Sequence, residues 1–202
     1  MTRIIAIVAA VAIVALLGGL YWMSLSGGDD KFAQCRGGQV AGSIGGPFEL
    51  VSETGETVTE AEVIDEPALI YFGYTSCPDV CPVDVARNAD AVDILEERGY
   101  SVKPVFISID PERDTPQVVD DFTANLHPRM LGLTGSPEQV KAASQAYRSF
   151  YQAHDDGTDY YLVDHSTFTY LMLPESGFAD FFRNDVSASQ MADRAQCFMD
   201  AR

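Results

Sequence analysis

The pattern of hydrophobic and polar residues predicts an alternation of strands and helices over most of the chain. Apolar runs of strand length, either continuous or alternating with polar residues, predict strands within 48–60, 68–74, 102–110, 130–135 and 159–182. The first segment predicts a β-hairpin around Gly55, and the last predicts two strands joined by a Pro-Glu-Ser-Gly turn. The continuous apolar runs at 68–74 and 102–110 are typical of central strands that are buried on both faces.

Apolar residues at helical spacing predict four helices between and after these strands. Ser136 is a predicted N-cap, and Asp114 or Thr115 caps the helix in which Pro116 lies near the first position. The helices are predicted within 82–98, 110–126, 136–153 and 187–201. Strand and helix therefore alternate with a hairpin at each end, which implies an α/β sandwich with a mixed central sheet flanked by helices. Strands joined by the short helical crossovers are expected to be parallel.

The start of the chain has a different character. Ile4–Met23 is a stretch of twenty residues without a charge, and a helix of that length spans a bilayer core of roughly 30 Å. A cleaved signal peptide is the alternative, but Tyr21 and Trp22 suit the membrane interface better than a cleavage site. Arg3 precedes the stretch and acidic residues follow it, so the positive-inside rule predicts that the rest of the chain is extracytoplasmic. We predict an anchor at 1–23, a flexible Gly- and Ser-rich tether at 24–43 and one domain at 44–202.

Charge narrows the functional classes. The chain has 30 acidic and 13 basic residues and a formal net charge of −17. Nucleic acid is excluded as an expected partner, because phosphate binding needs clustered Lys and Arg. The acidic residues are dispersed, which is typical of a soluble, self-repelling surface.

Candidate chemistry lies in YFGYTSCPDVCP, where Cys77 and Cys81 follow the apolar run at 68–74. Residues four apart share one face of a helix, so both sulfurs can converge where the strand leads into the helix. N–H groups at a helix start lower a thiol's pKa and favour the thiolate, which both attacks and ligates. A disulfide across so short a loop removes little chain entropy. The pattern therefore favours a redox couple or a metal site over a purely structural bridge.

Three histidines are candidates for a third ligand. His127 follows a predicted helix, where an exposed or capping role is expected, and His154 lies in an acidic loop where it is expected to be solvated. His165 interrupts an apolar segment, so its ring is either satisfied in the core or directed into a site. Asp164 points to the opposite face if the segment is extended, so we expect it to tune the site without binding metal.

Five motifs, in this order, resemble the SCO/SenC family of membrane-anchored copper proteins. They are GGPFEL (45–50), YFGYTSCPDVCP (71–82), ISIDPERDTP (107–116), LTGSPEQ (133–139) and VDHSTFTYLM (163–172). The resemblance implies a thioredoxin-like fold in which Cys77, Cys81 and His165 bind copper as Cu(I) or Cu(II). Two thiolates and an imidazole are soft enough for Cu(I), although zinc is a chemical competitor.

The resemblance also implies a function. The protein is expected to be a copper chaperone that delivers copper to the binuclear site of cytochrome c oxidase subunit II during assembly. Its expected partners are the copper-site domain of that subunit, copper donor proteins and a thiol reductant. Its expected location is the bacterial inner membrane, as a single-pass protein whose domain faces the periplasm.

Two other functions stay open at this stage. A thiol-disulfide oxidoreductase would use Cys77 and Cys81 as its redox residues, and no other catalytic residue is expected. A copper or redox sensor would need a separate transducer. Thioredoxin-type oxidoreductases place a cis-proline opposite their thiols, and here no proline occurs from Glu138 through Leu173, which favours the metal.

Two further features lie outside the predicted site. Cys35 and Cys197 are near the two ends of the predicted domain. Because an exported domain favours oxidation, we predict a structural disulfide that joins the tether to the last helix. The acidic motif DPERDTP is predicted to form a turn and a helix cap with an internal partner for Arg113, and not a second metal site.

Overall fold

A computed structural model describes residues 2–25, 31–37, 43–154, 157–158 and 160–202. The chain divides into two compact units, Met1–Ala33 and Gln34–Arg202. The first unit contains α1 (Thr2–Leu25). Within the described residues, no helix is long and apolar enough to cross a membrane. The predicted anchor and tether both include residues outside the described ranges, and their boundaries stay predictions.

The second unit is built on a seven-stranded mixed sheet with the order β2-β1-β5-β4-β3-β8-β9. The central strands β3, β4 and β5 are parallel to one another, as the crossover connections predict, and the hairpins β1–β2 and β8–β9 are antiparallel. Every residue of β3 is buried, which confirms a central strand. The strands are β1 (Glu49–Ser52), β2 (Thr57–Thr59), β3 (Ala68–Gly73), β4 (Lys103–Ser108), β5 (Leu131–Thr134), β8 (Thr169–Leu173) and β9 (Gly177–Phe182).

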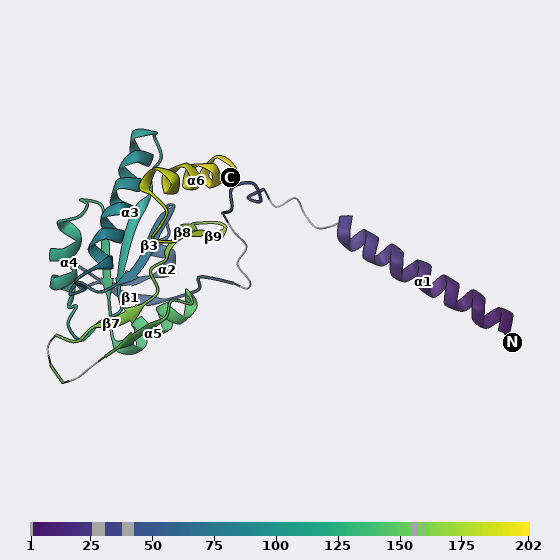
Figure 1. Cartoon of the computed structure of the whole chain (residues 1–202), viewed down its shortest axis with the longest axis horizontal. Coiled ribbons are helices and arrows are strands. Elements are labelled where there is room, and N and C mark those ends of the chain that lie inside the picture. The colour runs from purple at the N-terminus through teal and green to yellow at the C-terminus, as the bar shows by residue number, and fades with distance from the viewer. Residues whose placement is uncertain (1, 26–30, 38–42, 155–156, 159) are drawn as a thin grey trace. The chain divides into compact units, whose positions relative to one another are not determined.

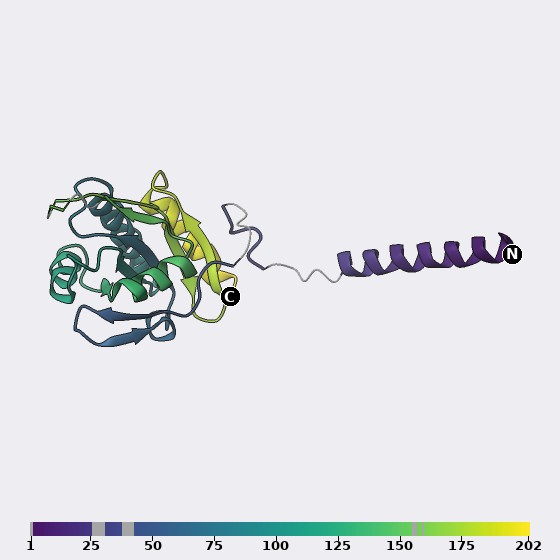
Figure 2. The ribbon, with the colours of Figure 1, turned by 90° about the horizontal axis from the view of Figure 1, so that it is seen from below.

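Helices cover both faces of this sheet. Figures 1 and 2 show α3 and α6 together on one face and α5 on the other. Thr115 caps α4 and Ser136 caps α5 through their side chains, and both caps were predicted from the sequence. The helices of this unit are α2 (Glu60–Val63), α3 (Val80–Glu97), α4 (Pro116–Ala124), α5 (Pro137–Ala146) and α6 (Ala188–Asp200). The unit is therefore the predicted α/β sandwich.

Two predictions about the segment 136–182 are wrong. The helix predicted to reach residue 153 ends at Ala146, because Arg148 adopts a left-handed conformation with φ of 52°. After this break the chain forms a new strand, β6 (Tyr151–Ala153). The predicted strand pair around the Pro-Glu-Ser-Gly turn is confirmed as β8 and β9, but the segment 159–182 was wrongly predicted to contain no other strand. It also contains β7 (Val163–His165), which pairs with β6 outside the main sheet. His165 therefore lies on a two-stranded arm.

The segment at 34–37 is attached to the end of the domain by two contacts. A disulfide joins Cys35 to Cys197 of α6, with Cα atoms 5.6 Å apart, and this is the pairing predicted from the sequence. The backbone N–H of Gly37 donates to Asp180 Oδ2 at 3.1 Å, and Arg194 pairs with the same carboxylate. The buried charge of Asp180 is thus matched by a cation and a backbone donor.

The disulfide predicts a large effect on stability. It joins residues that are 162 positions apart in the sequence. Replacing both cysteines by serine should therefore lower the free energy of unfolding by about 4–5 kcal/mol on the chain-entropy model. Urea denaturation of the full-length chain without reductant measures this change, with the reduced wild-type chain as the control. Equal denaturation midpoints for the variant and the oxidised wild type would contradict the assigned role.

Candidate metal centre

Cys77 and Cys81 lie where β3 leads into α3. The helix begins at Val80, two residues earlier than predicted, so Cys81 is in its first turn and Cys77 is in the preceding loop. The backbone N–H of Cys81 points at Cys77 Sγ at 3.5 Å. A Cβ atom on Gly73, the last residue of β3, would lie 3.0 Å from Cys81 Sγ. Glycine at this position therefore leaves room for the second sulfur.

His165 reaches this junction from β7. Its Nε2 atom lies 3.3 Å from Cys81 Sγ, and the three ligand atoms of Cys77, Cys81 and His165 all lie within 4.8 Å of one another. The rings of Tyr71 and Tyr74 meet the imidazole edge-on, with centroids 6.2 and 5.8 Å away. The structure thus brings together the three residues that the sequence proposed as ligands.

A backbone hydrogen bond sets the tautomer of His165. Its Nδ1 atom is 2.9 Å from the carbonyl oxygen of Ser166. A carbonyl can only accept, so Nδ1 carries the proton and the neutral ring keeps a lone pair on Nε2, the atom that faces the sulfurs. Metal-binding histidines commonly donate their other N–H to a carbonyl or carboxylate in this way. This tautomer therefore presents the Nε2 lone pair to the sulfurs, as a metal ligand requires.

His127 belongs to another cluster of ligand atoms, with Asp93 and Glu96. Of the two roles expected for His127, exposed or capping, the exposed one is wrong, since the residue is only 5 % exposed. Its Nδ1 accepts a hydrogen bond from the backbone N–H of Arg129 at 3.1 Å, and its Nε2 lies 3.2 Å from Asp93 Oδ1. The proton of the neutral ring is therefore on Nε2, between the ring and the carboxylate. This tautomer does not suit a metal ligand, and Arg129 already pairs with Glu96.

His154 lies on the arm but faces away from the sulfurs. Its half-exposed side chain is 2.7 Å from Asp164 Oδ2, and that carboxylate is also exposed. Asp164 therefore makes its contact on the outer side of the arm, as expected for a residue that alternates with His165 along a strand.

The two thiols differ in their environments. Burial alone would raise the pKa of Cys77, but hydrogen bonds from the backbone of Asp79 and Cys81, together with the side chains of Cys81 and Tyr74, outweigh it and lower the pKa. Burial raises the pKa of Cys81 far above its usual range. Both side chains are buried, but Cys77 keeps 9 % exposure and Cys81 has none. Cys77 is therefore the thiol that ionises and meets solvent first.

Asp114 supports the cysteine loop, a role that the sequence did not suggest. This fully buried carboxylate accepts hydrogen bonds from the backbone and the hydroxyl of Thr75, at 3.0 and 2.5 Å, and from Ser108 Oγ at 2.6 Å. The turn, the cap and the Asp110–Arg113 pair predicted for DPERDTP are all present. The acidic residues of the motif marked it as a candidate site, but the sequence did not show which residue Asp114 binds, because its partner Thr75 is 39 residues away.

A second buried network lies on the helix side of the site. Tyr71 donates a hydrogen bond to Asp84 Oδ2 at 3.1 Å, and Arg87 pairs with Asp84 Oδ1 at 3.1 Å. Burial raises the pKa of Asp84, against the opposing effects of Arg87, Tyr71 and His165. Because Tyr71 also contacts the His165 ring, this network helps to fix the surroundings of the imidazole.

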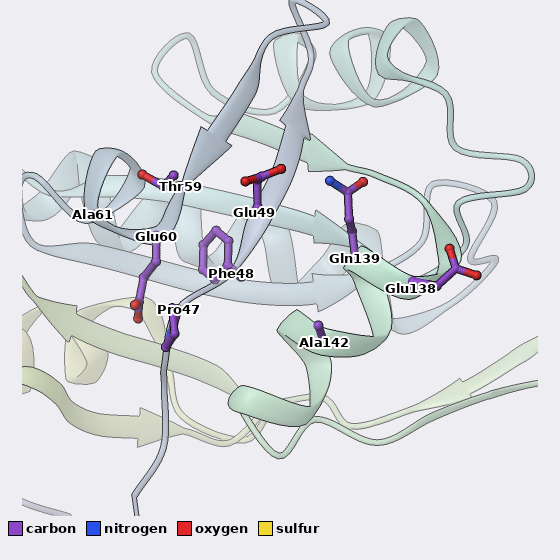
Figure 3. Close-up of a pocket in the computed structure, with 9 residues that line it drawn as sticks. All are labelled: Pro47, Phe48, Glu49, Thr59, Glu60, Ala61, Glu138, Gln139 and Ala142. Carbon is purple, nitrogen blue, oxygen red and sulfur yellow. The ribbon is translucent and has the colours of Figure 1, made fainter.

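The candidate ligands do not line the cavity shown in Figure 3. This cavity, of about 630 Å³, is formed by β1, α2 and α5 and their flanking residues. Its lining consists of Pro47, Phe48, Glu49, Thr59, Glu60, Ala61, Glu138, Gln139 and Ala142. The candidate metal centre is instead a small site that follows β3, at the strand end where open α/β sheets place their ligands.

Comparison with known proteins agrees with this geometry. The family model for SCO1/SenC matches residues 36–200. The chain belongs to the SCO1/SenC family. Protein SenC of Rhodobacter capsulatus is 56% identical to this SCO1/SenC chain over 174 residues, which cover 85% of this chain and 79% of that protein. SCO1 homolog 1 of Arabidopsis thaliana mitochondria is 43% identical over 152 residues, or 75% of this chain and 46% of that protein.

Solved structures of SCO1/SenC relatives share the fold. A crystal structure of Arabidopsis thaliana ScoI with copper bound has a TM-score of 0.74 and 41% identity, and covers 78% of this chain and 99% of its own. Yeast Sco1 with copper bound has a TM-score of 0.74 and 35% identity, and covers 80% of this chain and 91% of its own. The predicted mixed α/β, thioredoxin-like fold is therefore confirmed.

The asymmetry of the thiols gives a testable prediction. In the chain with Cys77 and Cys81 reduced, iodoacetamide should alkylate Cys77 first. Because the pKa of Cys77 is lowered, its alkylation should continue at pH values at which an ordinary thiol is already protonated and unreactive. Peptide mass spectrometry over a time course measures the order. The variant Cys77→Ser is the matched control, and its buried Cys81 should be nearly inert. Equal rates at both thiols would contradict the assignment.

Proposed function

We propose that this SCO1/SenC protein carries one copper ion on Cys77 Sγ, Cys81 Sγ and His165 Nε2 and delivers it to the binuclear copper site of cytochrome c oxidase subunit II. The main support is the convergence of two sulfurs and an imidazole lone pair, all within 4.8 Å of one another. Copper is the cargo of this process. The chain's own groups hold it, orient the third donor and leave one edge open to a partner.

The donor set favours copper over zinc. Two thiolates and one neutral imidazole match the soft ligands that Cu(I) prefers. A structural zinc site usually has four protein ligands, and the described residues bring only three His, Cys, Asp or Glu ligand atoms together here. Two of the solved relatives named above contain copper, which supports the same cargo for this chain.

Delivery follows from the accessibility of the site. Cys77 keeps 9 % exposure and His165 is partly exposed, so the thiols of a partner can reach these two ligands first and replace the ligands one at a time. The partners we propose are the copper-site domain of subunit II, a copper donor protein and a thiol reductant that keeps Cys77 and Cys81 reduced in an oxidising compartment. The proposal includes an anchor at 1–23 in the bacterial inner membrane, with the domain facing the periplasm.

The alternative function is a thiol-disulfide oxidoreductase that reduces the cysteines of the same copper site. The observation that favours it is the pairing of a thiol of lowered pKa that keeps 9 % exposure with a fully buried neighbour, since such a pair suits attack followed by resolution. In this reaction the Cys77 thiolate attacks the partner disulfide, and Cys81 then displaces the second partner thiol. Two electrons pass to the partner and a Cys77–Cys81 disulfide remains.

Removing the imidazole tests the copper proposal. The variant His165→Ala should bind Cu(I) at least about tenfold more weakly than wild type, because one of three donors is lost while both sulfurs remain. Competition with a chromophoric Cu(I) chelator measures the affinity. The control His127→Gln should bind copper as wild type does, since glutamine can still donate to Asp93 and accept from Arg129. Unchanged affinity in His165→Ala would remove His165 from the ligand set.

A transfer experiment separates the two functions. The copper-loaded chain is mixed with the reduced copper-site domain of subunit II, and the reduced copper-free chain is mixed with the oxidised domain. A chaperone should metallate the reduced domain, and His165→Ala should lose this activity while it still reduces the oxidised domain. If wild type reduces the domain but transfers no copper, the oxidoreductase function replaces the proposed one.

A further inference from the structure

The arm that carries His165 leads into β8 but does not itself pair with the main sheet. Within the described residues, strands β6 and β7 pair only with each other, with Tyr151 opposite His165 and Ala153 opposite Val163. The cysteines, by contrast, follow β3, which is bonded on both sides by β4 and β8. The distance from the imidazole to the sulfurs therefore depends on what holds the arm against the end of β3.

Arg113 makes the most extensive of the described contacts between the arm and the loop after β4. Its guanidinium stacks on the ring of Tyr161 with 3.7 Å from Cζ to the centroid, and its Nη1 donates to the Tyr161 carbonyl at 2.9 Å. Its Nε donates to Asp110 Oδ2 at 2.5 Å. The Tyr161 hydroxyl completes a ring of contacts by donating to Asp110 Oδ1 at 2.6 Å. We call Asp110, Arg113 and Tyr161 the clasp.

The clasp is anchored on the rigid side of the site. Asp110 is buried, and its backbone carbonyl accepts hydrogen bonds from the N–H groups of Arg113 and Asp114. Asp114 in turn binds Thr75 of the cysteine loop. Burial of the hydroxyl and its bond to Asp110 raise the pKa of Tyr161 to about 12, so the phenol stays a donor at neutral pH. The clasp thus joins the arm to the elements that position the thiols.

Tyr74 connects the clasp to the metal ligand. Its hydroxyl accepts a hydrogen bond from the backbone N–H of Val163 at 3.4 Å, its ring meets His165 edge-on at 5.8 Å, and Arg113 Cζ lies 5.6 Å from the same ring. Tyr74 therefore contacts both Arg113 and Val163 at the start of β7. Displacement of Arg113 would loosen both Tyr161 and the ring that supports the imidazole.

We infer that Arg113 is a positioning residue: through the clasp with Asp110 and Tyr161, it holds the histidine arm closed over the two thiols and thereby sets the rate at which copper leaves. This inference rests on the proposed copper function and adds the element that controls release. The sulfurs keep their places when the clasp opens, and the imidazole moves. The site then passes from three donors to two, which is the state that a partner's thiols can attack most readily.

The test is the rate of copper release from the full-length chain. The Cu(I)-loaded protein is mixed with excess bathocuproine disulfonate, and colour formation gives the rate. Arg113→Gln should release copper roughly tenfold faster than wild type, the factor expected when one charge-assisted hydrogen bond is lost. Arg113→Lys keeps the charge but not the planar fork, so it should behave like Arg113→Gln. The surface variant Arg129→Gln, which also removes an arginine paired with carboxylates, should release copper at the wild-type rate.

The same substitution in a His165→Ala background shows whether Arg113 acts through the imidazole. Without His165, Arg113→Gln should cause no further acceleration. In the wild-type background, Arg113→Gln should also shift the visible spectrum of the Cu(II)-loaded chain toward that of His165→Ala. An equal acceleration in both backgrounds, or wild-type release from Arg113→Gln, would overturn the inference.

A milder variant guards against misfolding, because Arg113→Gln leaves the Asp110 carboxylate buried without its cation. Tyr161→Phe removes only the hydroxyl bonded to Asp110, so it should accelerate release in the same direction by a smaller factor, again only when His165 is present. If His165→Ala itself releases copper at the wild-type rate, both the proposed ligand set and the clasp are overturned. If His165→Ala is fast while Tyr161→Phe and Arg113→Gln both match wild type, only the clasp is overturned.

Discussion

The hydrogen bond from His165 Nδ1 to the carbonyl of Ser166 is the interaction on which the proposed metal centre depends. It leaves the lone pair of the neutral ring on Nε2, which is 3.3 Å from Cys81 Sγ. With the opposite tautomer, the same ring would present a proton to the sulfurs. His127 shows this contrast within the same chain, because a backbone N–H occupies its Nδ1 and its Nε2 proton faces Asp93. Two clusters thus have similar distances, but only the first has a free imidazole donor.

The fold holds the three donors on different elements. Cys77 and Cys81 lie at the end of a fully buried strand, and Asp114 ties their loop to the start of α4. His165 lies on a short arm whose two strands, in the part of the chain that the structure describes, pair with each other and not with the main sheet. The proposed carrier must bind its ion firmly and still release it, and donors that are held by different elements suit both needs. In the proposed function, the main sheet would hold the two sulfurs in place, and the separate arm would carry the imidazole.

The sequence predicted the central features well, because they rest on strong local patterns. Continuous apolar runs identified β3 and β4, cap residues identified the starts of α4 and α5, and the cysteine spacing identified the site. The arm was missed, since the segment from 159 to 182 carries apolar residues on both sides of His165 and periodicity cannot show that it divides between two sheets. The helix end at Ala146 was missed because Arg148 is an unusual residue for a left-handed conformation. The burial of His127 and the reach of Asp114 to Thr75 depend on tertiary contacts that no local pattern contains.

The most direct test of the central claim is X-ray absorption spectroscopy at the copper edge of the Cu(I)-loaded, full-length chain. The proposed site predicts a first shell of two sulfur atoms and one nitrogen atom, with Cu–N scattering typical of an imidazole that disappears in His165→Ala. A first shell of sulfur alone in the wild type, or one that His165→Ala leaves unchanged, would contradict the claim that a tautomer-fixed imidazole completes the site.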